Sequence, residues 1–260
     1  MKEIYQYQQQ IPGKVQENSV GVYIGIPFCP TRCLYCSFTS NQQGPEEIEK
    51  YMAALMREIE YGGEALRRSG SRPESVYIGG GTPTTLEADG LDALLSKIKQ
   101  CFDLSELKEF TVEAGRPDTI TAEKLRVIAG HGIKRISINP QTMKDQTLKL
   151  IGRSHSVDDI RTAFKMAEAA GDFIINADVI AGLPEETPED FENTLKELIE
   201  IGPANITVHT LAVKRASRLI EKDDTYHYKQ SETVGRMLEI SRQLPGAAGY
   251  KPYYLYRQKH

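Results

Sequence analysis

The stretch G-I-P-F-C-P-T-R-C-L-Y-C-S-F, residues 25–38, places Cys29, Cys33 and Cys36 within eight positions. It follows the run Val20 to Ile26, whose β-branched and aromatic residues are typical of a strand buried in a parallel sheet. Thiolates are soft ligands that suit iron–sulfur clusters, zinc and copper(I). Ordinary zinc and electron-transfer sites use four protein ligands, so the spacing C-x3-C-x2-C predicts a metal site with one position open for a small molecule.

Composition indicates an ordinary globular chain. Its 260 residues are 40% hydrophobic and 26% charged, which fits one domain with a sizeable core. The formal net charge of -4 gives no basic footprint for nucleic acid, so we expect none to bind. We also expect no membrane span, because no apolar run reaches the necessary length. Four cysteines, three of them clustered, favour a reducing compartment, and we predict a cytoplasmic protein in which Cys101 is a small core residue.

Strand-like and helix-like patterns alternate along most of the chain. This alternation predicts βα units and a parallel sheet with outer helices, curled into a partial (βα)6 barrel of the TIM type. The active site of such a fold lies at the C-terminal ends of the strands. Strands are predicted at residues 20–26, 75–78, 110–113, 134–138, 173–180 and 206–213, and helices at 45–68, 91–98, 121–129, 145–151, 157–170 and 189–201.

The domain prediction has three parts. Residues 1–19 are polar and Gln-rich, and we interpret them as an N-terminal arm or linker. Residues 20–228 form the barrel core. Residues 229–260 are predicted to form a helix over 229–244 and a Tyr-rich strand from about 249 to 256, as the start of a truncated C-terminal region.

Several polar motifs fall at or just beyond the predicted strand ends, where they should converge. The G-G-G-T-P loop, residues 79–83, indicates close backbone approach to a ligand, although a tight turn is the alternative. Glu113 ends a strand, where it either faces the mouth of the barrel or pairs with Arg116 or Lys134. Asp178 lies inside an apolar run, so it should also face the pocket.

Two further residues remain open on sequence alone. Arg153 has the guanidinium fork that binds carboxylates, but a solvated surface arginine is the simpler interpretation. His209 is either an inward pocket residue or a core histidine, and the core position is favoured.

The motif C-x3-C-x-Y-C after G-I-P-F, followed about one βα unit later by G-G-G-T-P, resembles the radical S-adenosylmethionine superfamily. The segments Y-I-G-I-P-F-C, Y-I-G-G-G-T-P-T, T-V-E-A, R-I-S-I-N-P-Q-T, I-G-R-S-H and D-V-I-A-G-L-P-E-E-T are similar, in that order, to the oxygen-independent coproporphyrinogen III dehydrogenase (oxidase) family. The resemblance runs from about Val20 to Leu211. The segments H-T-L-A-V-K-R-A-S and P-Y-Y-L-Y-R-Q-K resemble its bacterial HemZ-like branch.

The resemblance implies a set of cofactors and ligands. Cys29, Cys33 and Cys36 would hold a [4Fe-4S] cluster whose fourth iron binds the amino and carboxylate groups of S-adenosylmethionine. The main chain near Tyr35 would meet the adenine. The methionyl amino group and the nucleoside and carboxylate sites would be lined by Gly80, Gly81, Thr82, Glu113, Gln141, Arg153 and Asp178.

The resemblance also implies a reaction. An electron from a donor such as flavodoxin or ferredoxin would split S-adenosylmethionine into methionine and a 5′-deoxyadenosyl radical, which takes hydrogen from the substrate. In the family, this leads to oxidative decarboxylation of coproporphyrinogen III to protoporphyrinogen IX. Phe38 stands where the well-known dehydrogenases carry another cysteine, which makes a heme-binding or heme-trafficking protein the alternative. A methyl-transferring relative is a third, and zinc could occupy the thiolates if iron were lost.

Overall fold

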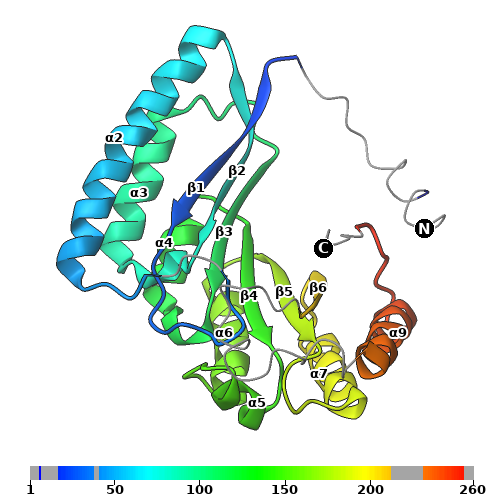
Figure 1. Ribbon diagram of the computed structural model, residues 1–260. Coiled ribbons are helices and arrows are strands. Elements are labelled where there is room, and N and C mark those ends of the chain that lie inside the picture. The colour runs from blue at the N-terminus through cyan, green and yellow to red at the C-terminus, as the bar shows by residue number, and fades with distance from the viewer. Residues whose placement is uncertain (1–5, 7–16, 38–40, 212–230, 255–260) are drawn as a thin grey trace.

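The computed structural model describes residue 6 and residues 17–37, 41–211 and 231–254. Within them, six parallel strands form one sheet in the order β1-β2-β3-β4-β5-β6 (Figure 1). Each connection therefore leads to the adjacent strand, and the sheet curls into a partial barrel with β1 and β6 at its edges. The predicted fold class is confirmed. The strands are β1 (Ser19–Ile26), β2 (Arg72–Gly80), β3 (Glu109–Gly115), β4 (Arg135–Gln141), β5 (Ile174–Ala181) and β6 (Asn205–Thr210).

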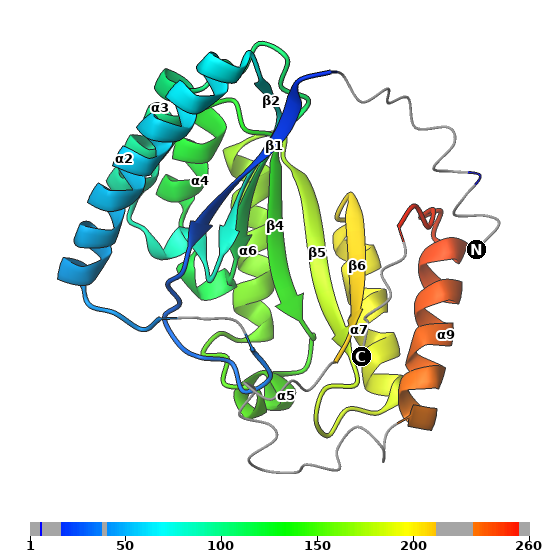
Figure 2. The same cartoon turned by 45° about the horizontal axis from the view of Figure 1, so that its top comes forward.

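Helices cover the outer side of the sheet (Figure 2). Neighbouring helices pack in the order α2, α3, α4, α6, while α9 packs against α7 and contacts β5. None of the helices within the described residues combines the length and apolarity needed to cross a bilayer. The helices are α2 (Pro45–Ser69), α3 (Ala88–Cys101), α4 (Ala122–Gly130), α5 (Asp145–Leu150), α6 (Val157–Ala170), α7 (Pro188–Ile201) and α9 (Ser231–Ala247), with short 3-10 helices η1 (Pro83–Thr85) and η2 (Pro117–Thr119).

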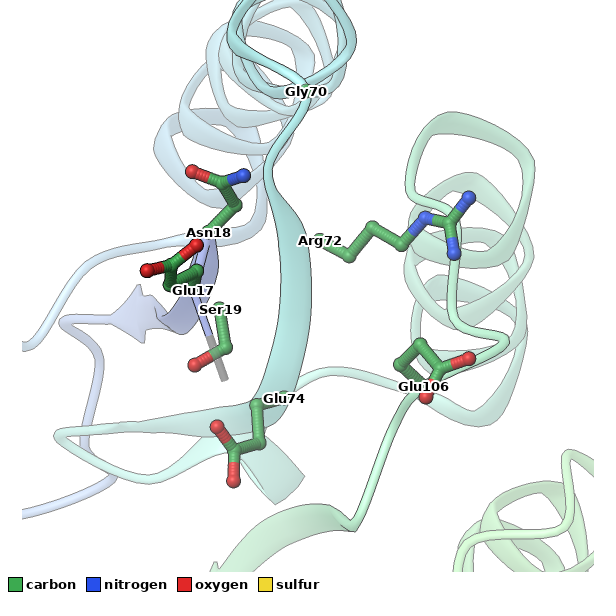
Figure 3. Close-up of a pocket in the computed structure, with 7 residues that line it drawn as sticks. All are labelled: Glu17, Asn18, Ser19, Gly70, Arg72, Glu74 and Glu106. Carbon is green, nitrogen blue, oxygen red and sulfur yellow. The ribbon is translucent and has the colours of Figure 1, made fainter. Parts of the chain in front are cut away.

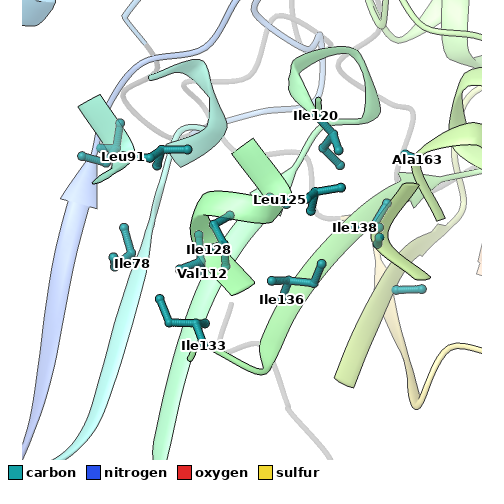
Figure 4. Close-up of a cluster of buried hydrophobic side chains, with 14 of the residues drawn as sticks. Ile78, Leu91, Val112, Ile120, Leu125, Ile128, Ile133, Ile136, Ile138 and Ala163 are labelled. Atoms are coloured by element: carbon teal, nitrogen blue, oxygen red, sulfur yellow. The ribbon is translucent and has the colours of Figure 1, made fainter. Parts of the chain in front are cut away.

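The hydrophobic core lies between the strands and the helices (Figure 4). Successive side chains of a strand point to opposite faces, so alternate residues reach this core. On β4, for example, Ile136 and Ile138 are fully buried in the core, while Ser137, Asn139 and Gln141 point to the inner side of the barrel. The same alternation places Glu113 of β3 and Asp178 of β5 on the inner face, where Ile180 joins a small apolar cluster.

Local capping fixes where the helices begin and end. Thr121 caps α4, since its Oγ1 accepts a hydrogen bond from the Lys124 amide at 3.2 Å. Ser156 and Thr187 form capping boxes at the starts of α6 and α7. Helices α2 and α7 end at Gly70 and Gly202, both in the left-handed conformation that glycine adopts most easily.

The C-terminal region differs in part from prediction. The helix α9 is present, but the described residues 250–254 of the predicted Tyr-rich strand are not in a strand. A high β-propensity needs a sheet edge to pair with, and here Tyr250 instead donates its hydroxyl to the Pro203 carbonyl at 2.7 Å. The last sheet strand ends at Thr210, and residues 212–213 and 255–256 of the predicted strands, like Phe38, lie outside the described residues. The division at residues 19 and 228 stays a prediction.

Candidate functional site

The cysteine loop leaves the C-terminal end of β1 and packs on the G-G-G-T-P loop that follows β2. The Sγ of Cys29 lies 3.4 Å from the Thr82 hydroxyl, and the Gly81 amide donates to the Ile26 carbonyl at 2.7 Å. A Cβ added at Gly81 would lie 2.6 Å from the Phe28 carbonyl oxygen and 3.0 Å from the Cys29 sulfur. Only glycine fits this close approach, so the loop is more than a tight turn.

Glu113, near the end of β3, contacts the same glycine loop. Its Oε2 accepts a hydrogen bond from the Gly80 amide at 3.2 Å, and Gly80 has a φ of 117°. The alternative salt bridge to Arg116 is wrong, because Arg116 pairs with Asp118 at 2.8 Å. Burial and the nearby charge of Asp178 raise the pKa of Glu113 to about 7. Glu113 is therefore a carboxyl group that can change protonation near neutral pH.

Asp178 and His209 face each other on β5 and β6. Asn176 donates to Asp178 Oδ1 at 2.6 Å, and His209 Nε2 lies 3.6 Å from Asp178 Oδ2. Hydrogen bonding to Asp178 raises the pKa of His209. The core position favoured for His209 is wrong, since 52% of its side chain is exposed. The inward position of Asp178 agrees with the expectation from sequence.

Arg153 is buried, so the surface interpretation is wrong. It is 7% exposed, and its Nη1 and Nη2 donate to the Asn139 carbonyl at 3.0 Å and to the Tyr35 hydroxyl at 3.2 Å. Burial raises the pKa of Tyr35 above its ordinary value, so that hydroxyl is neutral. This contact brings the cysteine loop and the α5–α6 connection together at the mouth of the barrel.

The inner face of β4 carries buried side-chain oxygens that have no hydrogen-bond partner among the described residues. Gln141 ends the strand with a φ of 70° and is 8% exposed. Its Oε1, the Asn139 Oδ1 and the Ser137 Oγ are buried and have no hydrogen-bond partner within the described residues. Buried acceptors normally have a partner, so these atoms fit a ligand that supplies N–H or O–H groups.

The sequence reasoning missed the part played by Arg116, which is 3% exposed. Its Nη1 donates to the carbonyl and hydroxyl oxygens of Thr31 at 3.1 and 2.8 Å, and lies 3.9 Å from the Cys33 sulfur. Its Nε and Nη2 donate to Asp118, which also accepts from Ser154. Burial opposes ionisation of Asp118, but these hydrogen bonds and one from His155 lower its pKa well below the usual range. A charged residue just after β3 was the available signal.

The donor set has the chemistry of an iron–sulfur site. Cys29, Cys33 and Cys36 carry the thiol groups, and thiolates are soft ligands that such clusters use. Within the described ranges, no three His, Cys, Asp or Glu side chains are gathered as a single-ion site. The Cys29 sulfur lies beside the glycine loop, and the inner face of β4 offers the buried oxygens described above for a polar ligand.

A cavity of about 390 Å³ lies at the N-terminal ends of the strands (Figure 3). It opens where β1 and β2 begin, whereas the cysteine loop follows the other end of β1. It contains none of the predicted site residues, and its lining is formed by Glu17, Asn18, Ser19, Gly70, Arg72, Glu74 and Glu106.

Comparisons with known proteins identify the family of this chain. The radical SAM superfamily model matches residues 23–198. The chain is 41% identical over 247 residues to the oxygen-independent coproporphyrinogen-III oxidase-like protein HemZ of Bacillus subtilis, covering 94% of this chain and 49% of HemZ. It is 30% identical over 242 residues to the heme chaperone HemW of Haemophilus influenzae, covering 90% of this chain and 61% of HemW.

A solved structure shows the same fold. The radical SAM enzyme HemN of Escherichia coli, a coproporphyrinogen III oxidase, aligns with a TM-score of 0.79 at 23% identity, over 90% of this chain and 54% of that chain. The chain spans about half the length of the curated relatives it matches, 49% of HemZ and 61% of HemW. With this family match over the barrel, the chain belongs to the radical SAM superfamily, which works with a [4Fe-4S] cluster and S-adenosylmethionine, and it resembles the heme- and porphyrin-related members.

Proposed function

We propose that Cys29, Cys33 and Cys36 hold the [4Fe-4S] cluster and leave one iron open for S-adenosylmethionine. The full-length protein would then carry out oxygen-independent oxidative decarboxylation of coproporphyrinogen III to protoporphyrinogen IX. The observation that carries the cofactor proposal is the contact between the two loops, with the Cys29 sulfur 3.4 Å from the Thr82 hydroxyl. The similarity to HemZ supports the reaction.

The surrounding residues have groups suited to S-adenosylmethionine. Gly80, Gly81 and Thr82 bring the backbone close to the cysteine loop, where carbonyl oxygens can accept from the methionyl ammonium. Arg153 has a buried Nε without a partner in the described part of the chain, and this donor can meet the methionyl carboxylate.

The nucleoside would lie along β3 to β5. Glu113 and Asp178 offer carboxylate oxygens, Gln141 offers its unpaired Oε1, and the main chain at Tyr35 would meet the adenine. When bound, the cluster and S-adenosylmethionine supply an electron and a 5′-deoxyadenosyl radical that takes hydrogen from a substrate propionate. A flavodoxin or ferredoxin would provide the electron, and the cytoplasmic location stays a prediction.

Anaerobic reconstitution tests the ligand assignment. Changing Cys29, Cys33 or Cys36 to Ala should remove most of the bound iron and sulfide, because each thiolate holds one corner of the cluster. The matched control is Cys101→Ala, since Cys101 is a buried cysteine at the end of α3. Full iron content in all three loop variants would contradict the proposal.

The reaction is tested with the full-length protein under anaerobic conditions. We expect 5′-deoxyadenosine to form in step with loss of carboxylate from coproporphyrinogen III, measured by chromatography. Cleavage of S-adenosylmethionine without carboxylate loss would leave the cofactor assignment standing and reject this substrate.

A second candidate is a heme-binding protein of the same fold. The similarity to the heme chaperone HemW and the pair Ser37-Phe38 after the third cysteine favour it. Its signature would be stoichiometric heme binding, followed by optical spectroscopy, with coproporphyrinogen left intact. No specific observation favours the methyl-transferring alternative, which stays untested.

A further inference from the structure

Arg116 connects the end of β3 to the cysteine loop, yet it is not among the residues assigned to either cofactor. We propose that Arg116 is a positioning residue for the cluster. It holds the cysteine loop in place, and its charge beside Cys33 raises the reduction potential of the cluster. This inference rests on the proposed cluster ligands. It adds a residue that fixes both the shape and the electrostatics of their loop.

Arg116 holds the cysteine loop through directed hydrogen bonds. Arg116 Nη1 donates to both the carbonyl and the hydroxyl of Thr31, which lies between Cys29 and Cys33. The Thr31 hydroxyl in turn donates to the Gly152 carbonyl at 3.0 Å, and the Leu34 amide donates to the Ile151 carbonyl at 3.0 Å. The cysteine loop is thus fixed from two sides, by the β3 end and by the α5–α6 connection.

The charge of Arg116 is oriented toward the cysteine. Its Nη1 lies 3.9 Å from the Cys33 sulfur, while its Nε and Nη2 donate to the two oxygens of Asp118 at 3.0 and 2.8 Å. Asp118 is itself held by the Ser154 hydroxyl at 2.7 Å and lies 3.3 Å from His155 Nδ1. The guanidinium therefore places its positive edge toward Cys33 and its carboxylate partner on the far side.

The positions of Arg116 and Asp118 predict the direction in which each charge shifts the reduction potential of the cluster. The buried Arg116 cation would stabilise the reduced state of a cluster held at Cys33, because one-electron reduction would make that cluster more negative. Removal of the cation should make the cluster harder to reduce. Removal of the Asp118 charge should make it easier to reduce, because that anion partly cancels the field of Arg116. A purely structural role predicts no such opposition.

The test is a redox titration of the reconstituted chain, followed by electron paramagnetic resonance, with iron content measured alongside. Arg116→Gln should shift the midpoint to more negative potential by at least a tenfold change in the reduction equilibrium, about 59 mV for one electron. Asp118→Asn should shift it to more positive potential, and Arg116→Lys, which keeps the charge, should restore most of the wild-type value.

The matched control is Arg67→Gln. Arg67 also donates to a cysteine, through the Cys101 carbonyl at 2.9 Å, but it lies on α2 away from the loop, so its loss should leave the midpoint unchanged. Shifts of the same sign in Arg116→Gln and Asp118→Asn, or none, would overturn the inference. If Arg116→Gln loses its iron, the midpoint potential of Asp118→Asn provides the test: a shift to more positive potential supports the inference, and a shift to more negative potential overturns it. Failure of the wild-type chain to take up iron would instead reject the cluster ligands themselves.

Discussion

The two faces of the sheet are built by the same six strands but differ in chemistry. On the outer face, Val112, Ile136 and Ala177 are fully buried against the helices. The inner face instead carries Glu113 and Asp178, which are partly exposed to solvent and accept hydrogen bonds from Gly80 and Asn176. The outer face can supply most of the stability through apolar burial, and this leaves the inner face free to carry groups that are costly in a core.

Ile136 and Ser137 give the sharpest version of this comparison, because they are adjacent on β4 and point to opposite faces. Ile136→Ala should lower the free energy of unfolding by about 2–5 kcal/mol, through lost burial and the cavity left behind. Ser137→Ala should change it by less than about 1 kcal/mol or raise it, since the Ser137 Oγ is buried and unpaired in the described structure. Chemical unfolding measures both, and equal losses would break the comparison.

The next largest effect concerns Glu113 in the cluster-free chain. Its pKa in the folded state is about 7, above the ordinary 4.5, so the unfolded state loses its proton first and stability falls as pH rises from about 4.5 through 7. Glu113→Gln removes the cost of ionising this buried carboxyl group. The free energy of unfolding at pH 8 should rise by up to about 3 kcal/mol, with no gain at pH 4, as measured by urea unfolding. A gain at both pH values would reject the electrostatic explanation.

Glu186, in the β5–α7 connection, is the matched control. It is 5% exposed, accepts from the Thr142 hydroxyl, and burial raises its pKa to about 7 as well. Glu186→Gln should therefore raise stability at pH 8 to a similar degree. Only Glu113→Gln should also weaken S-adenosylmethionine binding in the reconstituted chain, measured by anaerobic calorimetry. Equal loss of affinity in both variants would mean that the inner face has no special role.

The difference between the faces also explains what the sequence could predict. The outer face leaves a periodic apolar pattern, and this predicted the alternating helices and parallel strands. The cysteine spacing and the glycine loop are local motifs, so their joint position at the strand ends also followed from sequence. The prediction of a Tyr-rich strand was wrong for the described residues 250–254, because β-propensity alone does not decide whether a segment pairs with a sheet.

The contacts at the mouth of the barrel were harder to predict, because they join segments that are distant in sequence. Arg116 and Thr31 are 85 residues apart, and Arg153 and Tyr35 are 118 residues apart. An isolated arginine in either segment looks like a surface residue until the fold brings its partner close. The predicted core position of His209 was wrong for a related reason. An open barrel exposes an inward side chain that a closed core would bury.

The smallest effect we expect is at this His209, near the β6 edge of the inner face. Asp178 raises the pKa of His209 above 6.5, so the pair stabilises the fold below that pH, and this contribution is lost as pH rises through the folded pKa. In Asp178→Asn, the His209 pKa measured by nuclear magnetic resonance should fall back toward its ordinary value. Asp92→Asn, which removes the partner of His131 at the α3 surface, should leave the pKa of His209 unchanged. An unaltered His209 pKa in Asp178→Asn would mean that solvent already screens the pair, and that polar neighbours on the inner face are coupled only where burial excludes water.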